Sequence, residues 1–360
     1  MRVADAGAKE HDPVQRAHQH IGKGRAVAAG VSAARRDIAI GVAARFSYNS
    51  GISACEKGEQ WQQALSLLGE LGQTAAGPDL ISYSAAISAC EKSGQWHRAL
   101  VLLGQIWHAN IEPNIVIYGA SISACEKGGQ WQQALSLLDE LGRIKLSANI
   151  ITFSAAISAC EKCSQWRHAL SLFNWIQKAG LQPNLISYNA AISACEKSEQ
   201  WQQALVLLSQ LRQAKLSPNI ISCNAAMSAC EKGGQWQQAV SLLGELTRLS
   251  LQPDVISCNA AISACGKDGW WRQALTLLGE LRLLQYIPDV ISYGAAISAC
   301  EKSGQWQQAL DLYRELPQAK VNANVICLTA AISACEEGGQ WQQAVSLLRE
   351  IERGIACETL

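Results

Sequence analysis

The sequence predicts an all-α protein, a solenoid of tandem helix-turn-helix repeats. Three observations lead to this prediction: the 360-residue chain repeats itself every 35 residues, each repeat holds two apolar helical patterns, and a polar break separates them. A single pair of short helices cannot bury both of its apolar faces, so neighbouring pairs must stack. With 49% hydrophobic residues, the composition suits an ordered protein.

Nine repeats follow one another in phase. They span residues 45–79, 80–114, 115–149, 150–184, 185–219, 220–254, 255–289, 290–324 and 325–359. Residues 1–44 form an N-terminal extension outside this array. Its part after Ile21, rich in alanine and arginine, is typical of a transit peptide, whereas its acidic residues are not, so a decayed repeat is the other interpretation.

Repeat 185–219 shows the pattern of the first helix. Tyr188, Ile192 and Cys195 have the i, i+4 and i+7 spacing of one helical face. Ser187 is placed to cap the start of this helix, because a serine side chain accepts hydrogen bonds from free amides of the first turn. The polar stretch 197–200 predicts the break between the two helices.

The second helix of this repeat is expected to begin near Trp201. Its apolar residues follow at helical spacing, at Trp201, Ala204, Leu205, Leu208 and Leu211. Pro218 comes after them, and six of the eight prolines of the chain occupy the same position in their repeats. Because proline lacks an amide hydrogen, it predicts the stop of the helix.

Two columns of a single residue type run through the array. Tryptophan opens every second helix, at Trp61, Trp96, Trp131, Trp166, Trp201, Trp236, Trp271, Trp306 and Trp341. Cysteine recurs in every first helix, at Cys55, Cys90, Cys125, Cys160, Cys195, Cys230, Cys265, Cys300 and Cys335. We expect both columns to be buried, the tryptophans filling the joints between repeats and the cysteines acting as small apolar side chains. Cys160 and Cys163 form a single C-x-x-C pair, which without a second pair or a histidine cluster predicts no metal site.

Charge and composition argue against several functions. The 30 basic and 30 acidic residues cancel, so no long-range field draws the chain to nucleic acid. Polar or charged residues interrupt every apolar stretch, which argues against a membrane role. The six histidines form no triad and no metal cluster, so the sequence predicts neither an enzyme nor a cofactor.

The repeats resemble those of the pentatricopeptide repeat family, helical RNA-binding proteins of organelles. The resemblance covers residues 45–359 and rests on the 35-residue period, an opening of the form [ILV]-[ST]-Tyr-Asn-x-x-Ile, an Ala-Leu-x-Leu-Leu second helix and a Pro-Asp/Asn end. It implies a right-handed superhelix of the P-class type, without a carboxy-terminal catalytic domain, that binds single-stranded RNA at one base per repeat.

In that family the fifth and last residues of each repeat read the base. The fifth residues here are Asn49, Ser84, Gly119, Ser154, Asn189, Asn224, Asn259, Gly294 and Thr329. The last residues are Asp79, Asn114, Asn149, Asn184, Asn219, Asp254, Asp289 and Asn324, with Thr359 ending the ninth repeat. An Asn side chain is long enough to reach a pyrimidine, whereas Ser leaves room for a purine, and Asp only accepts where Asn also donates. Drift at exposed positions of recently duplicated repeats is the alternative explanation.

The resemblance also implies an order of bases. Asn with Asp resembles the uridine reader of the family, Ser with Asn its adenosine reader, and Asn with Asn a looser pyrimidine reader. With the 5′ end of the RNA at the amino terminus, the array implies U-A-(A)-A-Y-U-U-(A), where parentheses mark the repeats of Gly119 and Gly294. The expected partner is therefore an AU-rich single-stranded RNA.

Two further columns match RNA contacts of the family. The second residues match its wedges between bases, at Phe46, Ile81, Val116, Ile151, Ile186, Ile221, Ile256, Ile291 and Ile326. A lysine row matches its phosphate contacts, at Lys57, Lys92, Lys127, Lys162, Lys197, Lys232, Lys267 and Lys302. Since nearly every one of these lysines follows a glutamate, a solvated Glu-Lys surface is the alternative. Glu337 replaces the lysine in the last repeat, which we expect to act as a cap.

The family implies an organellar protein, with the chloroplast ahead of the mitochondrion as its location. The resemblance implies a monomer that acts in RNA processing, stabilisation or translation, with protein partners for any processing step. A helical scaffold for protein-protein interaction is the alternative function. An inert product of repeat expansion is a third interpretation, and it predicts no preference among RNA sequences.

Overall fold

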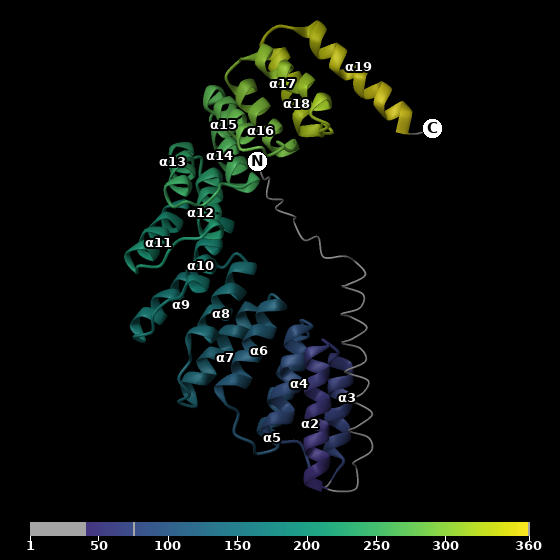
Figure 1. The fold of residues 1–360 in the computed structure, drawn as a ribbon, viewed down its shortest axis with the longest axis vertical. Coiled ribbons are helices and arrows are strands. Elements are labelled where there is room, and N and C mark those ends of the chain that lie inside the picture. Colours follow the sequence, from purple (N-terminus) through teal and green to yellow (C-terminus); the bar gives the residue numbers. More distant parts are fainter. Residues whose placement is uncertain (1–40, 75, 359–360) are drawn as a thin grey trace, which may run out of the picture. The chain divides into compact units, whose positions relative to one another are not determined.

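The computed structural model describes residues 41–74 and 76–358, and every regular element in these two segments is an α-helix (Figure 1). The first helices of successive pairs are α2 (Gly41–Lys57), α4 (Leu80–Lys92), α6 (Ile115–Lys127), α8 (Ile150–Lys162), α10 (Leu185–Lys197), α12 (Ile220–Lys232), α14 (Val255–Lys267), α16 (Val290–Lys302) and α18 (Val325–Glu337). The second helices are α3 (Trp61–Gly72), α5 (Trp96–His108), α7 (Trp131–Arg143), α9 (Trp166–Lys178), α11 (Trp201–Gln213), α13 (Trp236–Arg248), α15 (Trp271–Leu283), α17 (Trp306–Gln318) and α19 (Trp341–Glu358). The predicted all-α solenoid of helical pairs is confirmed.

The chain divides into two compact units. One comprises the residues up to 163 together with 178–181, and the other comprises 164–177 and 182–360. In the first unit α2, α4, α6 and α8 stack on one another in order, and α3, α5 and α7 each pack against the first helix of their own pair and of the next. In the second unit α10, α12, α14, α16 and α18 form the same kind of stack (Figure 1).

The first helix of the array starts earlier than the repeat boundary at residue 45. Helix α2 begins at Gly41, so four residues assigned to the N-terminal extension continue the helix. The interpretation of the remaining extension as a transit peptide or a decayed repeat falls on residues outside those described. None of the helices in the described segments is long and apolar enough to cross a membrane.

Helix α10 shows that the capping prediction for Ser187 was wrong by three residues. The N-cap is Asn184, whose side chain accepts a hydrogen bond from the Ser187 amide at 2.9 Å. Ser187 occupies the third helical position, and its hydroxyl oxygen accepts a hydrogen bond from the Asn184 amide at 3.0 Å. The two residues thus form a reciprocal capping box that satisfies two amides otherwise left free at a helix start.

The end of α11 is set by backbone geometry rather than by Pro218. The helix stops at Gln213, and Lys215 adopts a left-handed φ of 58°. The Leu216 amide then donates to the Leu211 carbonyl, which closes the final turn in the manner of a Schellman motif. Pro218 follows in the loop, where it leads the chain into the next N-cap, so our prediction that it stops the helix was wrong.

The core of each joint follows the predicted helical faces closely. Tyr188, Ile192 and Cys195 are buried, and all nine cysteines of the column are fully buried free thiols, as predicted. In α11 the buried residues include Leu207, which the sequence pattern missed, while Leu205 is only half-buried. Leu207 and Leu208 both point inward because α11 packs against α10 on one side and α12 on the other.

The tryptophan column is less buried than we predicted. Eight of the nine side chains are half-buried and Trp341 is 68% exposed. A methyl group added at Gly233, at the end of α12, would lie only 2.2 Å from Cδ1 of Trp201. The indole therefore rests on the carboxyl end of the next first helix, a place at the edge of the joint that solvent still reaches.

Candidate RNA interface

A row of exposed apolar side chains lies at the beginning of the first helices. These are the second residues of the repeats, and their exposed fractions run from 57% at Val116 to 69% at Phe46. A single exposed apolar residue on a protein surface is ordinary. A row with one exposed apolar residue in each repeat is unusual. Burial of these side chains against an apolar or aromatic face of a ligand would be favourable. The predicted wedges are therefore free to touch a ligand.

The last residue of each of the first eight repeats is the N-cap of the next first helix. In every case its side-chain oxygen accepts a hydrogen bond from the amide at the third position of that helix. An Asn or Asp is among the most favourable residues at an N-cap. These predicted base-reading residues thus also have a structural role, which fixes where their side chains point.

Side chains of the fifth and last positions meet in the repeats that carry Asn at the fifth position. The Asn49 amide nitrogen donates to Asp79 at 3.3 Å, although 30 residues separate them. The Asn224 amide nitrogen lies 3.1 Å from one Asp254 oxygen and 3.2 Å from the other. Asn259 has the same relation to Asp289, at 3.1 Å from both oxygens. The predicted pairs in these repeats therefore come together as units.

A serine of the next repeat holds the other end of these Asn amides. The Ser82 hydroxyl donates to Oδ1 of Asn49 at 2.6 Å, and the Ser257 hydroxyl donates to Oδ1 of Asn224 at 2.8 Å. With its nitrogen on a carboxylate and its oxygen on a hydroxyl, each amide has one favoured orientation. Sequence reasoning missed these serines, which stand at the third position of the repeat that follows.

The Asn189 and Asn219 pair lacks this arrangement. The Asn189 nitrogen is 3.4 Å from Asn219 Oδ1, and its own Oδ1 is buried without a hydrogen-bond partner among the described residues. Ser222 donates to Asn219 rather than to Asn189. The orientation of the Asn189 amide is therefore less firmly set than that of Asn224.

The two glycine repeats lack such a pair. A methyl group added at Gly294 would lie 3.2 Å from Sγ of Cys327, and one added at Gly119 would lie 3.7 Å from the Thr152 methyl group. Glycine at these two positions leaves open space where the other repeats have a fifth-position side chain. The Thr329 hydroxyl donates to the Val325 and Ile326 carbonyls of its own helix, so it is turned away from a neighbouring last position. Thr359 lies outside the described residues.

The carboxylates of Asp254 and Asp79 are held in the ionised form. Burial alone would raise the pKa of Asp254, but hydrogen bonds from Ser257 and Asn224 outweigh burial and lower that pKa below its ordinary value. The pKa of Asp79 is likewise lowered, because the hydrogen bonds of Ser82 and Asn49, with the charge of Arg45, outweigh burial. Both residues therefore present acceptor oxygens, not donors, at neutral pH.

The lysine row forms ion pairs from one repeat to the next. Lys92 lies 2.9 Å from Glu56, Lys127 lies 3.5 Å from Glu91, Lys162 lies 3.1 Å from Glu126, and Lys232 lies 2.8 Å from Glu196. Except for the half-buried Lys232, the lysines of the row are exposed. The row is accessible to a phosphate backbone, but a carboxylate already neutralises several of its charges.

Lys302 differs from these paired lysines. The glutamate that would match it in the preceding repeat is replaced by Gly266. A methyl group at this glycine would lie 2.6 Å from the Ala295 carbonyl oxygen, so α14 and α16 approach too closely for a side chain here. The Lys302 ammonium instead donates to the Lys267 carbonyl at 2.7 Å. Its charge is not cancelled by a bonded carboxylate.

The C-x-x-C pair does not form a metal centre with other groups. Cys160 is buried, and the Cys163 thiol donates to the Gly129 carbonyl at 3.0 Å. Across residues 41–74 and 76–358, no group of three or more His, Cys, Asp or Glu side chains could hold a metal ion.

The fold and the row of paired polar residues define a modular helical-repeat protein. Three sequence models of one family match the chain: the PPR repeat family at residues 148–197, the pentatricopeptide repeat domain at 66–128, 101–163 and 241–303, and the PPR repeat at 186–216, 221–251 and 291–321. Together they cover more than half of the chain, which belongs to the pentatricopeptide repeat family. No curated protein matches the sequence.

Among solved structures the chain is similar to the pentatricopeptide repeat protein PPR10 in complex with an 18-nt psaJ RNA element. The identity is 19% and the TM-score 0.57, over 86% of this chain and 50% of that one. A structure of PPR10 from maize matches with 19% identity and a TM-score of 0.54, over 86% and 49% of the two chains. This chain thus spans about half the length of PPR10, and at this identity the likeness concerns the fold.

Proposed function

We propose that this protein binds single-stranded RNA in a sequence-selective way, one base per repeat. The observation that carries the proposal is the pairing of fifth and last residues, beside an exposed apolar residue, in the four repeats that have Asn at the fifth position. Membership of the pentatricopeptide repeat family and the fold shared with PPR10, which was solved with RNA, support it.

In this proposal each base enters between two exposed second-position residues and meets the polar pair at its edge. Ile221 and Ile256 would sandwich the base that Asn224 and Asp254 read. Stacking of a base on such side chains is tolerant of sequence, whereas hydrogen bonds to its Watson-Crick edge discriminate. We propose U-A-(A)-A-Y-U-U-(A) as the preferred order, and so an AU-rich target.

The phosphate contacts are assigned to the lysine row. A lysine in an exposed ion pair can exchange its carboxylate for a phosphate at little cost, because such pairs contribute only about 0 to 1 kcal/mol. Without the help of a net positive charge, we expect most of the affinity to come from the bases and the apolar wedges.

We further propose an organellar address, in the chloroplast before the mitochondrion, and action as a monomer. The protein would act in processing, stabilisation or translation of its RNA by covering it, with partner proteins supplying any chemistry. Fusion of residues 1–44 to a fluorescent protein would test the address. Fluorescence confined to the cytosol would contradict it.

The test of the main proposal is binding of the full chain to an RNA carrying UAAAUUUA. The comparison RNAs are a scrambled sequence of the same composition and a version with cytidine at each uridine position. We expect several-fold tighter binding to the first. Exchange of Asn224→Ser together with Asp254→Asn should move the preference to UAAAUAUA. Equal affinity for all these RNAs would reject the proposal and favour the protein scaffold.

A further inference from the structure

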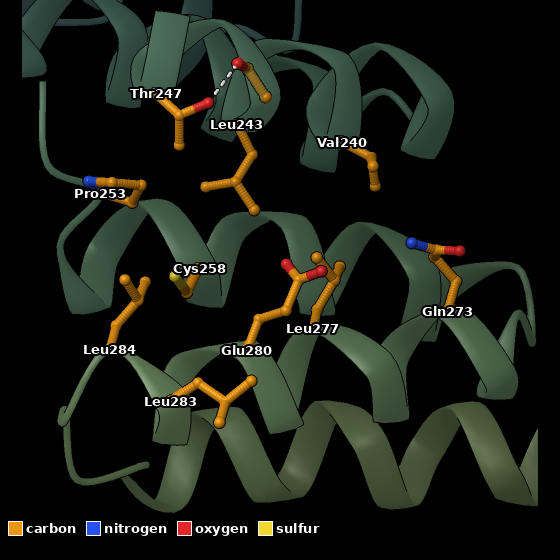
Figure 2. A pocket seen from close by; sticks show the side chains of 11 residues that line it. Val240, Leu243, Thr247, Pro253, Cys258, Gln273, Leu277, Glu280, Leu283 and Leu284 are labelled. Atoms are coloured by element: carbon orange, nitrogen blue, oxygen red, sulfur yellow. Dashed lines mark hydrogen bonds between the residues drawn. The ribbon is translucent and has the colours of Figure 1, made fainter. Parts of the chain in front are cut away.

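A cavity of about 460 Å³ lies between α13 and α15 in the second unit. Leu243 and Thr247 of α13 line one side, Cys258 of α14 lines the floor, and Leu277 and Glu280 of α15 line the other side. Figure 2 shows the Glu280 side chain rising from α15 toward Leu243, beside Leu277. The space is apolar apart from this carboxylate and a few polar atoms, which is the usual character of a site that takes one side chain or a small ligand.

Four other glutamates with described side chains hold the position of Glu280 in their repeats, and each is bound to a neighbouring side chain. Their partners are a tyrosine hydroxyl or an arginine: Tyr48 to Glu70 at 3.3 Å, Tyr118 to Glu140 at 2.8 Å, Arg212 to Glu245 at 3.2 Å, and Arg282 to Glu315 at 2.8 Å. A partner for this glutamate is therefore the rule among the described repeats other than that of Glu280.

Glu280 has neither kind of partner because two residues of its joint are short. Cys258 stands where Tyr48 and Tyr118 stand in their repeats, and Thr247 stands where Arg212 and Arg282 stand in theirs. Repeat 220–254 also has a cysteine at the tyrosine position, Cys223, but there Arg212 still reaches Glu245. Within the described part of the chain, Glu280 is exposed and bonded to no cation or hydroxyl. The two truncations open the cavity and leave its carboxylate without a partner.

The rim of the cavity is apolar in a way that the matching positions of other repeats are not. Leu283 is 84% exposed, where Arg143, Lys178 and Arg248 stand elsewhere. Ile287 is 76% exposed, at a position that is polar or glycine in the first six repeats and in the eighth. Leu284 is 45% exposed and lines the cavity beside Leu283, and Leu249, 43% exposed, directly follows the last residue of α13. Exposed apolar side chains around a cavity indicate a docking surface.

We infer that this cavity binds an arginine side chain of a partner protein, presented between apolar residues of the partner. The guanidinium would take the place that Arg212 and Arg282 take in their joints, with two parallel hydrogen bonds to the Glu280 carboxylate. The apolar neighbours of that arginine would cover Leu283, Ile287, Leu249 and Leu284. An arginine held in a desolvated pocket and ringed by apolar contacts is the usual composition of a dominant residue at a protein interface. This surface is built mainly by the second helices α13 and α15, with Cys258 of α14 among the lining residues, and uses none of the residues proposed to contact RNA.

The test uses the full chain and a fluorescein-labelled helical peptide with one arginine among leucines on its apolar face. A twin peptide carries citrulline, which has nearly the shape of arginine but no charge. We expect the arginine peptide to bind about tenfold more tightly or better, by fluorescence anisotropy, because the citrulline peptide would cover the Glu280 carboxylate without offering it a cation. Glu280→Gln should abolish the difference between the peptides. Thr247→Arg should abolish binding, since the new side chain would fill the cavity as Arg212 does in its joint.

Glu315→Gln is the matched control, because Glu315 is already paired with Arg282. We expect it to leave peptide affinity unchanged, and circular dichroism would show that all three variants keep their helices. Equal binding of the arginine and citrulline peptides to the unmodified protein would overturn the inference. Unchanged binding by the folded Thr247→Arg variant would overturn it as well.

Discussion

The side-chain nitrogen of Asn224 lies 3.1 and 3.2 Å from the two carboxylate oxygens of Asp254, and Asp254 at the same time caps α14. One carboxylate thus holds a helix start and a proposed base-reading amide. Only Asp and Asn occupy the last position of the first eight repeats. Both are strong N-caps, so exchange between them can alter hydrogen bonding to a base while the helix stays capped. The cap limits which residues this position can hold.

Removal of the serine hydroxyl should relax base selectivity at the Asn224 repeat. Ser257→Ala removes the donor at 2.8 Å from Asn224 Oδ1, so only the Asp254 carboxylate still holds the amide and its position is less firmly fixed. On the proposed function, we expect the preference for UAAAUUUA over UAAAUCUA to fall several-fold. The measurement is the ratio of the two dissociation constants, which a mere loss of stability would not change.

Ser222→Ala is the matched control for that experiment. Ser222 holds the same third position of a capping box but donates to Asn219 and not to Asn189. Its loss should cost the helix cap the same free energy and leave the selectivity at both repeats unchanged. If Ser257→Ala keeps the full preference while the unmodified protein shows it, the hydroxyl does not orient the reading amide.

The sequence sufficed for the fold because one helical pattern occurs nine times in phase. The positions of Tyr188, Ile192 and Cys195 lie on one helical face in every repeat, which chance would not produce. The helix positions and most of the core could therefore be predicted. Leu207 was missed because a helix packed on two sides buries a wider arc than one apolar stripe predicts. Ser187 was misassigned because a serine at the third position of a capping box looks like the cap itself.

Contacts between repeats were harder to predict than the helices. The hydrogen bond between Asn224 and Asp254 joins residues 30 positions apart, and no local sequence pattern predicts it. The cavity at Glu280 arises because Cys258 replaces the tyrosine and Thr247 replaces the arginine that other repeats have at these positions. A comparison of the repeats with one another would have found Cys258 and Thr247, since each departs from the residue that its position holds in other repeats. The hydrogen-bond distances between repeats and the exposure of the apolar side chains at the cavity could be obtained only from the structure.

Lys302 should contribute more to RNA binding than Lys127. Among the described residues, the Lys302 ammonium is bonded to a carbonyl alone, whereas Lys127 lies 3.5 Å from Glu91. For Lys302→Gln we expect the slope of log affinity against log salt to become less steep by about 0.7, the value for one phosphate contact on a single strand. Lys127→Gln should change the slope by much less. Identical slopes for both variants and the unmodified protein would remove the lysine row from the interface.

Gly233→Ala should destabilise the second unit. The added methyl group would lie 2.2 Å from Trp201 Cδ1, so the indole must shift from its place on the end of α12. Overpacking of this kind costs about 1 to 3 kcal/mol. Gly104→Ala in α5 is the control: a methyl group there meets nothing within 4 Å, and alanine favours a helix by about 0.5 to 1 kcal/mol over glycine. Thermal unfolding followed by circular dichroism should show opposite shifts, and a raised Tm for Gly233→Ala would mean that Trp201 does not rest there.

Cys163 should be the thiol of the C-x-x-C pair that reagents modify in the native protein. It is only half-buried, whereas burial, with the charge of nearby Cys163, raises the pKa of the fully buried Cys160 thiol to about 12. Because the thiolate is the reactive form, a raised pKa leaves Cys160 protonated at pH 8 and reactive only well above that pH. Brief iodoacetamide treatment at pH 8, followed by peptide mass spectrometry, should label Cys163 and spare Cys160. Treatment in denaturant should label both. Equal labelling of the two without denaturant would mean that α8 does not pack its cysteine face into the joint, and so would contradict the buried column on which the stacking of the repeats depends.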